Sequence, residues 1–217
     1  MELVFLIAMA GIIPLAIVTV YFGARYLLAQ KRTEALTQVA GELGMRFSPQ
    51  GDPALLASLS GLGIFSEGRS RKMTNLMQGV MRGMPVSIFD YKYDTGGYDT
   101  DSRTTWRQTM VCFETKTVFP SFSLQPEYLR HKIWSGQDID FKSHPGFSSH
   151  YLLRGNDSAA IRAQFTDRVM TFYDSQHRLG TEASGNRFVF YRQSVLIPPA
   201  EIQTFVEQGL QALALFQ

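Results

Sequence analysis

The stretch that most closely matches a known catalytic motif is YDTGGYDTD, residues 93–101. Asp-Thr-Gly carries the catalytic carboxylate of aspartic proteases, and a chain with one copy could build that site as a homodimer. Such an aspartate is buried after an apolar strand and shares a proton with its twin. Here the tripeptide follows Lys92 and continues into Gly97 and Asp99. This polar, glycine-rich composition predicts a solvated turn, and neither the spacing nor a closing glutamate fits an EF-hand calcium loop.

The histidines and the single cysteine give no catalytic or metal-binding pattern. His144 and His150 are separated by proline and glycine, and no cysteine or acidic residue joins them at ligand spacing. Cys112 lies in a predicted strand with Trp106 and Met110 on the same face, which is typical of an inert, buried thiol. No nucleophile elbow, Walker loop or dinucleotide fingerprint is present. We therefore predict no catalytic residue, no metal and no cofactor.

The stretch GLGIFSEGRSRK, residues 61–72, is the one loop that could bind an anion. Its glycines precede Arg69, Arg71 and Lys72, which could hold a phosphate or a lipid headgroup. The alternative is a flexible turn before an edge strand whose basic residues prevent edge pairing. A pocket that joins these cations to a buried carboxylate such as Asp90 would favour an enzyme instead.

An uncharged apolar stretch, LVFLIAMAGIIPLAIVTVYFG, occupies residues 3–23. Because a helix rises about 1.5 Å per residue, about twenty apolar residues cross a bilayer core of about 30 Å. Neither a positive region before this stretch nor a cleavage site after it supports a signal peptide. Residues 1–30 are therefore predicted to be a transmembrane anchor.

Basic residues lie on only one side of this stretch. The tail before it has no lysine or arginine, whereas Arg25, Lys31 and Arg32 follow it. The positive-inside rule then places the N-terminus outside and the rest of the chain in the cytoplasm, at the inner (plasma) membrane. These juxtamembrane cations, together with the basic cluster at residues 69–72, are a candidate surface for an anionic leaflet.

Residues 31–44 predict an amphipathic helix that continues from the anchor. Leu36 and Ala40 belong to its apolar stripe, and Gly44 is a helix stop. The stripe needs a partner, which could be the following domain or a second copy of the chain.

The remaining residues, 45–217, predict an α+β cytoplasmic domain. The segments around Arg82–Gly83 indicate a hairpin, a third long strand follows, and a second hairpin is expected around Gly185–Asn186. Asp52 is a predicted helix N-cap, and either Asp157 or Ser158 is expected to cap a later helix. The expected architecture is an antiparallel sheet with helices packed on one face, behind an N-terminal transmembrane helix.

Composition narrows the class of protein further. The chain has 217 residues and a formal net charge of +2, which does not favour a nucleic-acid-binding surface. A lone cysteine cannot form an intramolecular disulfide and fits a reducing compartment.

The soluble part resembles a bacterial family of uncharacterised membrane-anchored proteins with a domain of unknown function. Three stretches carry the resemblance: GRSRKMTNLMQGVMRGMPVSIFDYKY, DIDFKSHPGFSSHYLLRGND with the following AAIRAQF, and EASGNRFVFYR with the closing amphipathic helix. The resemblance implies one or more membrane helices ahead of a cytoplasmic α+β domain, and it implies no activity, cofactor or catalytic residue.

The sequence thus predicts a single-pass membrane protein whose cytoplasmic domain is an interaction, accessory or lipid-surface module. Its expected partners are the membrane through residues 3–23, anionic lipid, and a protein partner or a second copy of the chain. The alternative is an enzyme that acts on a membrane-associated or phosphorylated substrate near Gly61–Lys72.

Overall fold

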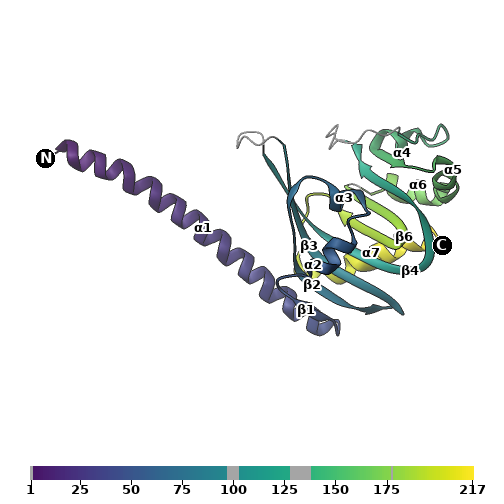
Figure 1. The fold of residues 1–217 in the computed structure, drawn as a ribbon, viewed down its shortest axis with the longest axis horizontal. Coiled ribbons are helices and arrows are strands. Elements are labelled where there is room, and N and C mark those ends of the chain that lie inside the picture. Colours follow the sequence, from purple (N-terminus) through teal and green to yellow (C-terminus); the bar gives the residue numbers. More distant parts are fainter. Residues whose placement is uncertain (1, 97–102, 128–137, 177) are drawn as a thin grey trace.

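The computed structural model describes residues 2–96, 103–127, 138–176 and 178–217, with side chains described from residue 20 onward. Figure 1 shows one long helix extending from a layered domain. The elements are α1 (Glu2–Glu42), β1 (Arg46–Ser48), α2 (Pro53–Ser58), α3 (Gly63–Ser66), β2 (Arg69–Met81), β3 (Met84–Thr95), β4 (Thr104–Pro126), α4 (Pro145–His150), β5 (Tyr151–Gly155), α5 (Ser158–Gln164), α6 (Asp167–Asp174), β6 (Leu179–Arg192), η3 (Pro199–Glu201) and α7 (Ile202–Ala214).

Helix α1 is continuous through both the predicted anchor and the predicted amphipathic segment. It ends where the sequence predicts, because Gly44 has a φ of +66° and the Met45 amide donates to the Ala40 carbonyl at 2.8 Å. This geometry is typical of a glycine-terminated helix. Leu36 and Ala40 are buried in the main core, so the apolar stripe packs against the chain's own domain.

The predicted membrane span, residues 3–23, falls mostly on residues whose side chains are not described. Within the described residues, no helix has both the length and the apolar character needed to cross a membrane. The transmembrane helix therefore stays a prediction from the sequence.

The described strands form one antiparallel sheet in the order β1-β2-β3-β4-β5, with β6 also paired to β4. The predicted hairpin is confirmed: Arg82 and Gly83, between β2 and β3, have φ values of +49° and +77°. Strand β4 pairs with β3 along its first part and with β5 along its last part, while β6 lies along its other edge.

The second predicted hairpin is instead a single strand, β6, that bends at Gly185. Both parts of β6 pair with β4, and the φ of Gly185 is +59°. The bend brings the ends of the strand together, so that the Gln193 amide donates to the Arg178 carbonyl at 2.8 Å. The sequence marked the right glycine but not the kind of turn.

Helices cover both faces of the sheet, which corrects the prediction of helices on one face. Helices α1, α4, α5, α6 and α7 contribute to one core, which includes Val111 and Phe113 of β4. On the other face, Leu62, Ile64 and Phe65 of the α2–α3 segment pack against a second core. Figure 1 shows α2 and α3 in front of the strands and α7 behind them. Helices α2 and α3 have only six and four residues, which is too short for a helical period of apolar residues to be recognised in the sequence.

Candidate functional site

Helix α1 is joined to the sheet through an ion pair between Arg32 and Asp90. Arg32 Nε donates to Asp90 Oδ2 and Nη2 donates to Oδ1, both at 2.8 Å. The two side chains are only 16% and 10% exposed. Arg32 Nη1 also donates to the Ile197 carbonyl at 2.8 Å. A bidentate pair has a fixed geometry, so it sets both the position and the rotation of α1 on the domain.

The same carboxylate is held by polar side chains of the neighbouring strands. Asn75 Nδ2 donates to Asp90 at 2.9 Å and Thr109 Oγ1 donates at 3.0 Å. Thr33 of α1 donates to Asn75 Oδ1 at 2.8 Å. Arg32, predicted to be a juxtamembrane cation facing lipid, is instead bound within the domain, because Asp90 and its partners occupy its guanidinium.

Three cations form a row across β2, β3 and β4 beside this network, and we call them the basic row. Lys72 is aligned with Lys92, and Lys92 is aligned with Arg107. Lys92 lies two positions from Asp90, so the row lies on the sheet face that binds α1. Lys72 and Arg107 are exposed, Lys92 is half-buried, and none of the three forms an ion pair with another described residue.

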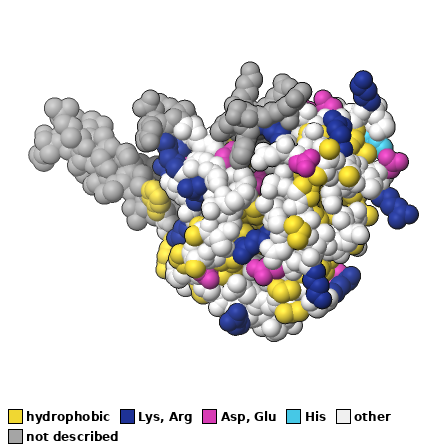
Figure 2. Space-filling view, turned by 45° about the vertical axis from the view of Figure 1, so that its right-hand side comes forward, with side chains coloured by type: hydrophobic (Ala, Val, Ile, Leu, Met, Phe, Trp, Pro, Cys, Tyr) yellow, Lys and Arg dark blue, Asp and Glu magenta, His cyan; other side chains and the backbone are white. Residues whose placement is uncertain are grey.

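Like charges directly opposite one another destabilise an antiparallel pair. The basic row is therefore an arrangement that the fold alone would not favour. Figure 2 shows cationic and anionic side chains interspersed over another view of the domain surface, without a broad basic field on that face. The cations of the basic row are therefore concentrated locally, within a chain whose net charge is only +2.

The predicted cluster of Arg69, Arg71 and Lys72 is divided by the structure. Lys72 joins the basic row, whereas Arg71 Nη1 donates to the Phe65 carbonyl of α3 at 3.0 Å. Arg69 is half-buried and aligned with Asp94 of β3. Arg69 and Lys72 lie on one sheet face, because their partners Asp94 and Lys92 are two positions apart on β3, whereas Arg71 reaches α3 on the other face.

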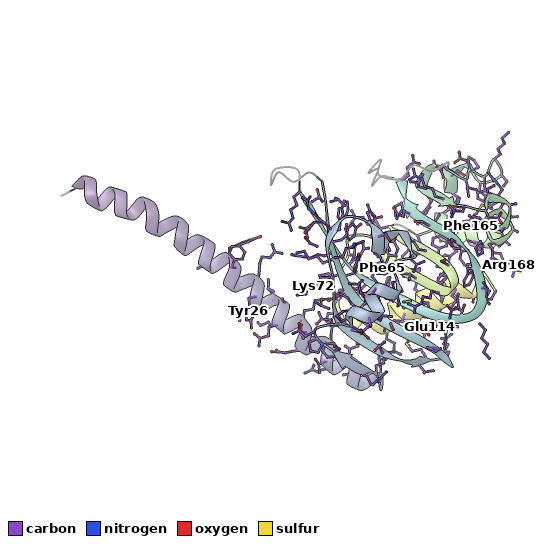
Figure 3. All side chains as sticks on the ribbon, viewed as in Figure 1. Tyr26, Phe65, Lys72, Glu114, Phe165 and Arg168 are labelled. Atoms are coloured by element: carbon purple, nitrogen blue, oxygen red, sulfur yellow. The ribbon has the colours of Figure 1, made fainter. Side chains whose placement is uncertain are left out.

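Arg25 and Lys31 are exposed on α1. Arg25 Nη1 donates to the Tyr21 hydroxyl at 2.9 Å, and its guanidinium lies 5.6 Å from the centre of that ring. Arg25 precedes Arg32 by about two helical turns, so both residues lie on one face of the helix. Figure 3 shows Lys72 at the side of the domain nearest to α1.

The Asp-Thr-Gly tripeptide begins with Asp94 near the end of β3. Its carboxylate is buried, pairs with Arg103 Nη2, and accepts a hydrogen bond from Thr105 Oγ1 at 2.7 Å. The Arg103 bond, followed by the Thr105 bond, lowers the pKa of Asp94 to about 2. A carboxylate held ionised in this way anchors the strand ends and does not share a proton. The predicted turn itself, at residues 97–102, lies outside the described residues.

A cavity of about 310 Å³ lies on the opposite sheet face, between the α2–α3 segment and strands β4, β5 and β6. Its floor is a row across three strands, because Ser123 of β4 is aligned with both Arg154 of β5 and Glu182 of β6. Gly61 and Gly63 line it from the α2–α3 segment. We call this space the Glu182 cavity.

Glu182 is fully buried within the floor of this cavity. Its carboxyl oxygens accept hydrogen bonds from the Ile64 amide at 3.1 Å, Ser123 Oγ at 3.0 Å and Gln125 Nε2 at 3.3 Å. Burial raises the pKa of Glu182 to about 7 despite these donors. The group therefore changes charge in the neutral range, which is common at functional sites.

Arg154 lines the same cavity from β5. Its Nε is buried and has no hydrogen-bond partner within the described residues. A buried donor without an acceptor costs free energy, so such donors are rare in native proteins and commonly mark a site where a ligand or an ion binds.

The sequence did not predict the Glu182 cavity. The signal was the stretch from Ser121 to Gln125, in which polar residues alternate with Phe122 and Leu124. That period of two marks a strand with one polar face inside the protein. The predicted glycine loop does reach a cavity with a buried carboxyl group, but that group is Glu182 and not Asp90.

The other candidate residues remain as ordinary side chains. His150 Nδ1 lies 2.8 Å from Asp174 Oδ1, and His131 and His177 are outside the described residues. In the described part of the chain, no group of three metal-ligating side chains is present. Cys112 is buried, and burial raises the pKa of its thiol to about 12. The expectation of no metal stays a prediction.

No family model matches the chain, and no curated protein matches it. Among solved structures, it is similar to the crystal structure of the mycobacterial trehalose monomycolate transport factor A, TtfA, with a TM-score of 0.64 and 14% identity. The likeness covers 85% of this chain and 94% of that chain. At this identity the likeness shows the fold alone. That solved neighbour is a bacterial protein, which agrees with the predicted resemblance to a bacterial family. No family model supports the membrane-anchored family.

Proposed function

We propose that this chain is a single-pass membrane protein whose domain works at a lipid surface as an accessory module. The observation that carries the proposal is the pairing of Arg32 with Asp90, which fixes α1 against the sheet face that holds the basic row. An anchor attached in this way would present the same face of the domain to the bilayer at all times.

The membrane part of the proposal rests on residues 3–23, which are uncharged and apolar and belong to the continuous helix α1. By the charge rule, the N-terminus lies outside and the domain lies in the cytoplasm. The step from Gly23 to Arg32 is about 14 Å along a helix. The basic row would then lie close to the headgroups of the cytoplasmic leaflet.

Anionic lipid is the partner that the basic row fits. Each lysine or arginine near a negatively charged leaflet contributes about 1 kcal/mol, and this attraction falls off within a Debye length. Three aligned cations would therefore orient the domain rather than bind it tightly. Arg25, on the same face of α1 as Arg32, would extend this contact toward the membrane.

The fold likeness supports an accessory role by analogy only. The neighbour's name describes a transport factor for trehalose monomycolate, and we extend to this chain only the idea of a helper protein at a membrane. The resemblance to a bacterial membrane-anchored family belongs to the same proposal.

The alternative, an enzyme acting near Gly61–Lys72, is favoured by one observation. Gly61 and Gly63 line a cavity that holds Glu182, whose pKa of about 7 suits proton transfer near neutral pH. Tyr91 and Tyr93, on the same sheet face, have pKa values raised far above the usual range by burial, so neither is an acid or base there.

Two experiments test the proposed function. Alkaline carbonate extraction of membranes should leave the full chain in the pellet, and release into the supernatant would contradict the anchor. For the lipid contact, residues 31–217 are mixed with neutral or anionic vesicles at low and high salt, once a cooperative melting curve shows that they are folded. Salt-sensitive flotation with anionic vesicles only is the expected result.

The matched variants make the second experiment specific. Neutralising the basic row with Lys72→Gln, Lys92→Gln and Arg107→Gln should abolish flotation. A control triple variant removes three exposed cations elsewhere, namely Lys116, Lys142 and Arg168, and should float as the native chain does. Equal loss in both triple variants would mean that net charge alone matters. No flotation of the native chain would direct the search to a protein partner or a second copy of the chain.

A further inference from the structure

The Glu182 cavity is on the sheet face opposite the basic row, so the lipid contact proposed above does not explain it. Two charged side chains point to a ligand there. Arg154 lines the cavity with a buried Nε that has no partner within the described residues. Glu182 is a fully buried carboxyl group whose hydrogen-bond donors, among those residues, are all uncharged. We propose that this cavity binds a small polyol that carries one anionic group, a phosphate or a carboxylate, with Arg154 holding the anion.

The strand register sets the geometry of this site. Arg154 and Glu182 are both aligned with Ser123, one on each side of β4, so the two residues project from the same sheet face. Adjacent strands are about 4.8 Å apart, which places the two backbones about 10 Å from each other. A ligand of the size of a small sugar acid or a glycerol phosphate would span that gap within about 310 Å³.

The arginine defines the charge of the ligand. A guanidinium group has a fork of donors that matches the paired oxygens of a carboxylate or phosphate. The free Nε of Arg154 belongs to that fork. The Asp138 carboxylate is close enough to Arg154 for their charges to interact, but Nε donates to no acceptor among the described residues. An anion in the cavity would satisfy this buried donor.

The polar, uncharged side chains that line the rest of the cavity indicate that the ligand carries hydroxyl groups. Ser66, Ser121, Gln125 and Asn156 surround the cavity with hydroxyl and amide groups. Such groups both donate and accept, as ligand hydroxyls require. Glu182 Oε2 accepts only the Ile64 amide among the described residues, so it keeps room for a ligand hydroxyl.

The ligand charge also has a consequence for proton binding. A ligand anion within this cavity would favour the neutral form of Glu182, because like charges in a buried site oppose one another. The pKa of Glu182 is raised to about 7, so a small further change alters its charge near neutral pH. Ligand binding should therefore take up a proton, and affinity should fall by up to about tenfold per pH unit above pH 7.

The test uses the full chain in detergent and isothermal titration with three probes: gluconate, glycerol 3-phosphate and neutral glycerol. Either anionic probe, but not glycerol, should bind. The affinity for gluconate, whose carboxylate stays ionised over this range, should fall between pH 6 and pH 8, whereas the phosphate of glycerol 3-phosphate itself titrates at about pH 6. Arg154→Met should weaken binding at least tenfold. Arg168→Met removes an exposed arginine of α6, labelled in Figure 3, that does not line this cavity, and the variant should bind as the native chain does. Glu182→Gln should bind with little dependence on pH.

A parallel arm distinguishes a free metabolite from a lipid headgroup. The full chain is placed in vesicles with or without phosphatidylglycerol, and protection of the β5 amides from hydrogen exchange is measured. Protection by phosphatidylglycerol that Arg154→Met removes, without binding of the soluble probes, assigns the ligand to a lipid headgroup. Absence of both effects, or equal effects in Arg154→Met and Arg168→Met, overturns the proposal. The basic-row variants should change neither readout, which separates failure here from failure of the proposed function.

Discussion

Arg32 of α1 and Asp90 of β3 form two parallel hydrogen bonds of 2.8 Å, although 58 residues separate them in the sequence. The pair occurs where the helix leaves the domain, because residues 20–31 of α1 are exposed and Leu36 and Ala40 are buried. Arg32, which the sequence predicts at a lipid surface, is therefore the residue that fixes the orientation of α1 relative to the sheet.

Replacing Asp90 by asparagine removes the charge partner of Arg32. We expect the free energy of unfolding to fall by about 2–4 kcal/mol, because breaking a mostly buried ion pair leaves an uncompensated charge. Urea unfolding, followed by circular dichroism, measures the loss. The pair of Arg82 and Glu207 is the control, because its arginine is 68% exposed, and Arg82→Met should cost less than Asp90→Asn. Equal costs for the two variants would contradict the role of the Arg32–Asp90 pair.

The Asp94 carboxylate should stabilise the fold in a manner that acid removes. Its pKa is about 2 in the folded chain against an ordinary value of 3.8, because Arg103 and Thr105 favour the ionised form. For a lowered pKa, the unfolded chain binds the proton first, so the stabilisation is complete above about pH 4 and is lost as pH falls through about 2. Asp94→Asn should therefore show a flatter dependence of stability on pH between 4 and 2.

Asp94→Asn also tests whether the carboxylate of the Asp-Thr-Gly tripeptide has a structural role or a catalytic one. If Asp94→Asn leaves the acid dependence unchanged, the carboxylate is not bound as described. A general peptidase assay of the native chain at acid pH should show no cleavage, since the carboxylate is already occupied.

The sequence predicted those features that short-range rules determine. Gly44 stops α1 because only a positive φ closes that helix end, and Arg82–Gly83 forms a tight turn for the same reason. Asp52 caps α2 by accepting hydrogen bonds from the Ala54 and Leu55 amides at 2.8 and 3.2 Å. Each of these features needs no knowledge of the rest of the fold.

The sequence could not predict the candidate sites, because they depend on strand register. Arg154 and Glu182 are 28 positions apart in the numbering, and only their shared alignment with Ser123 brings them together. Similarly, the register irregularity between Arg69 and Lys72 places both cations on the same sheet face, although three positions separate them in the sequence. A one-residue change of register moves a side chain to the other face of the sheet, and the register cannot be deduced from amino-acid composition.

Glu182 should make the fold less stable as pH rises. Its pKa is about 7 in the folded chain against an ordinary value of 4.5, because burial disfavours the charge. The folded chain then binds more protons than the unfolded chain, so stability falls between about pH 4.5 and pH 7, by about 3 kcal/mol at most.

Glu182→Gln tests this expectation directly. The variant cannot ionise at position 182, so its stability should stay level over the same pH range. Chemical unfolding of both chains at half-unit pH steps from 4.5 to 8 measures the difference. Parallel curves for the two chains would show that Glu182 titrates as an exposed glutamate does and would contradict its burial.

Lys92→Gln should stabilise the fold while it weakens the lipid contact. Lys92 lies between Lys72 and Arg107, and its charge also interacts favourably with Asp94, although as the last of the causes that lower the pKa of that carboxylate. Removal of the two repulsive contacts should outweigh this attraction and add about 0.2–1 kcal/mol to the free energy of unfolding. Thermal melting at low salt measures the gain, and high salt should reduce it. Lys116→Gln is the control and should change neither melting nor vesicle flotation. A loss of stability in Lys92→Gln would mean that the lysine has a structural partner.

Removal of residues 1–30 should leave a soluble, folded domain. Residues 20–31 are exposed along α1, and the contacts of the helix with the sheet begin at Arg32 and Thr33. A chain of residues 31–217 keeps those contacts and the buried side chains of Leu36 and Ala40. A chain of residues 46–217 loses all of them and uncovers part of the main core, so it should aggregate or melt well below the longer chain. Gel filtration and thermal melting compare the two, and insolubility of residues 31–217 would show that the domain needs the apolar segment for more than attachment.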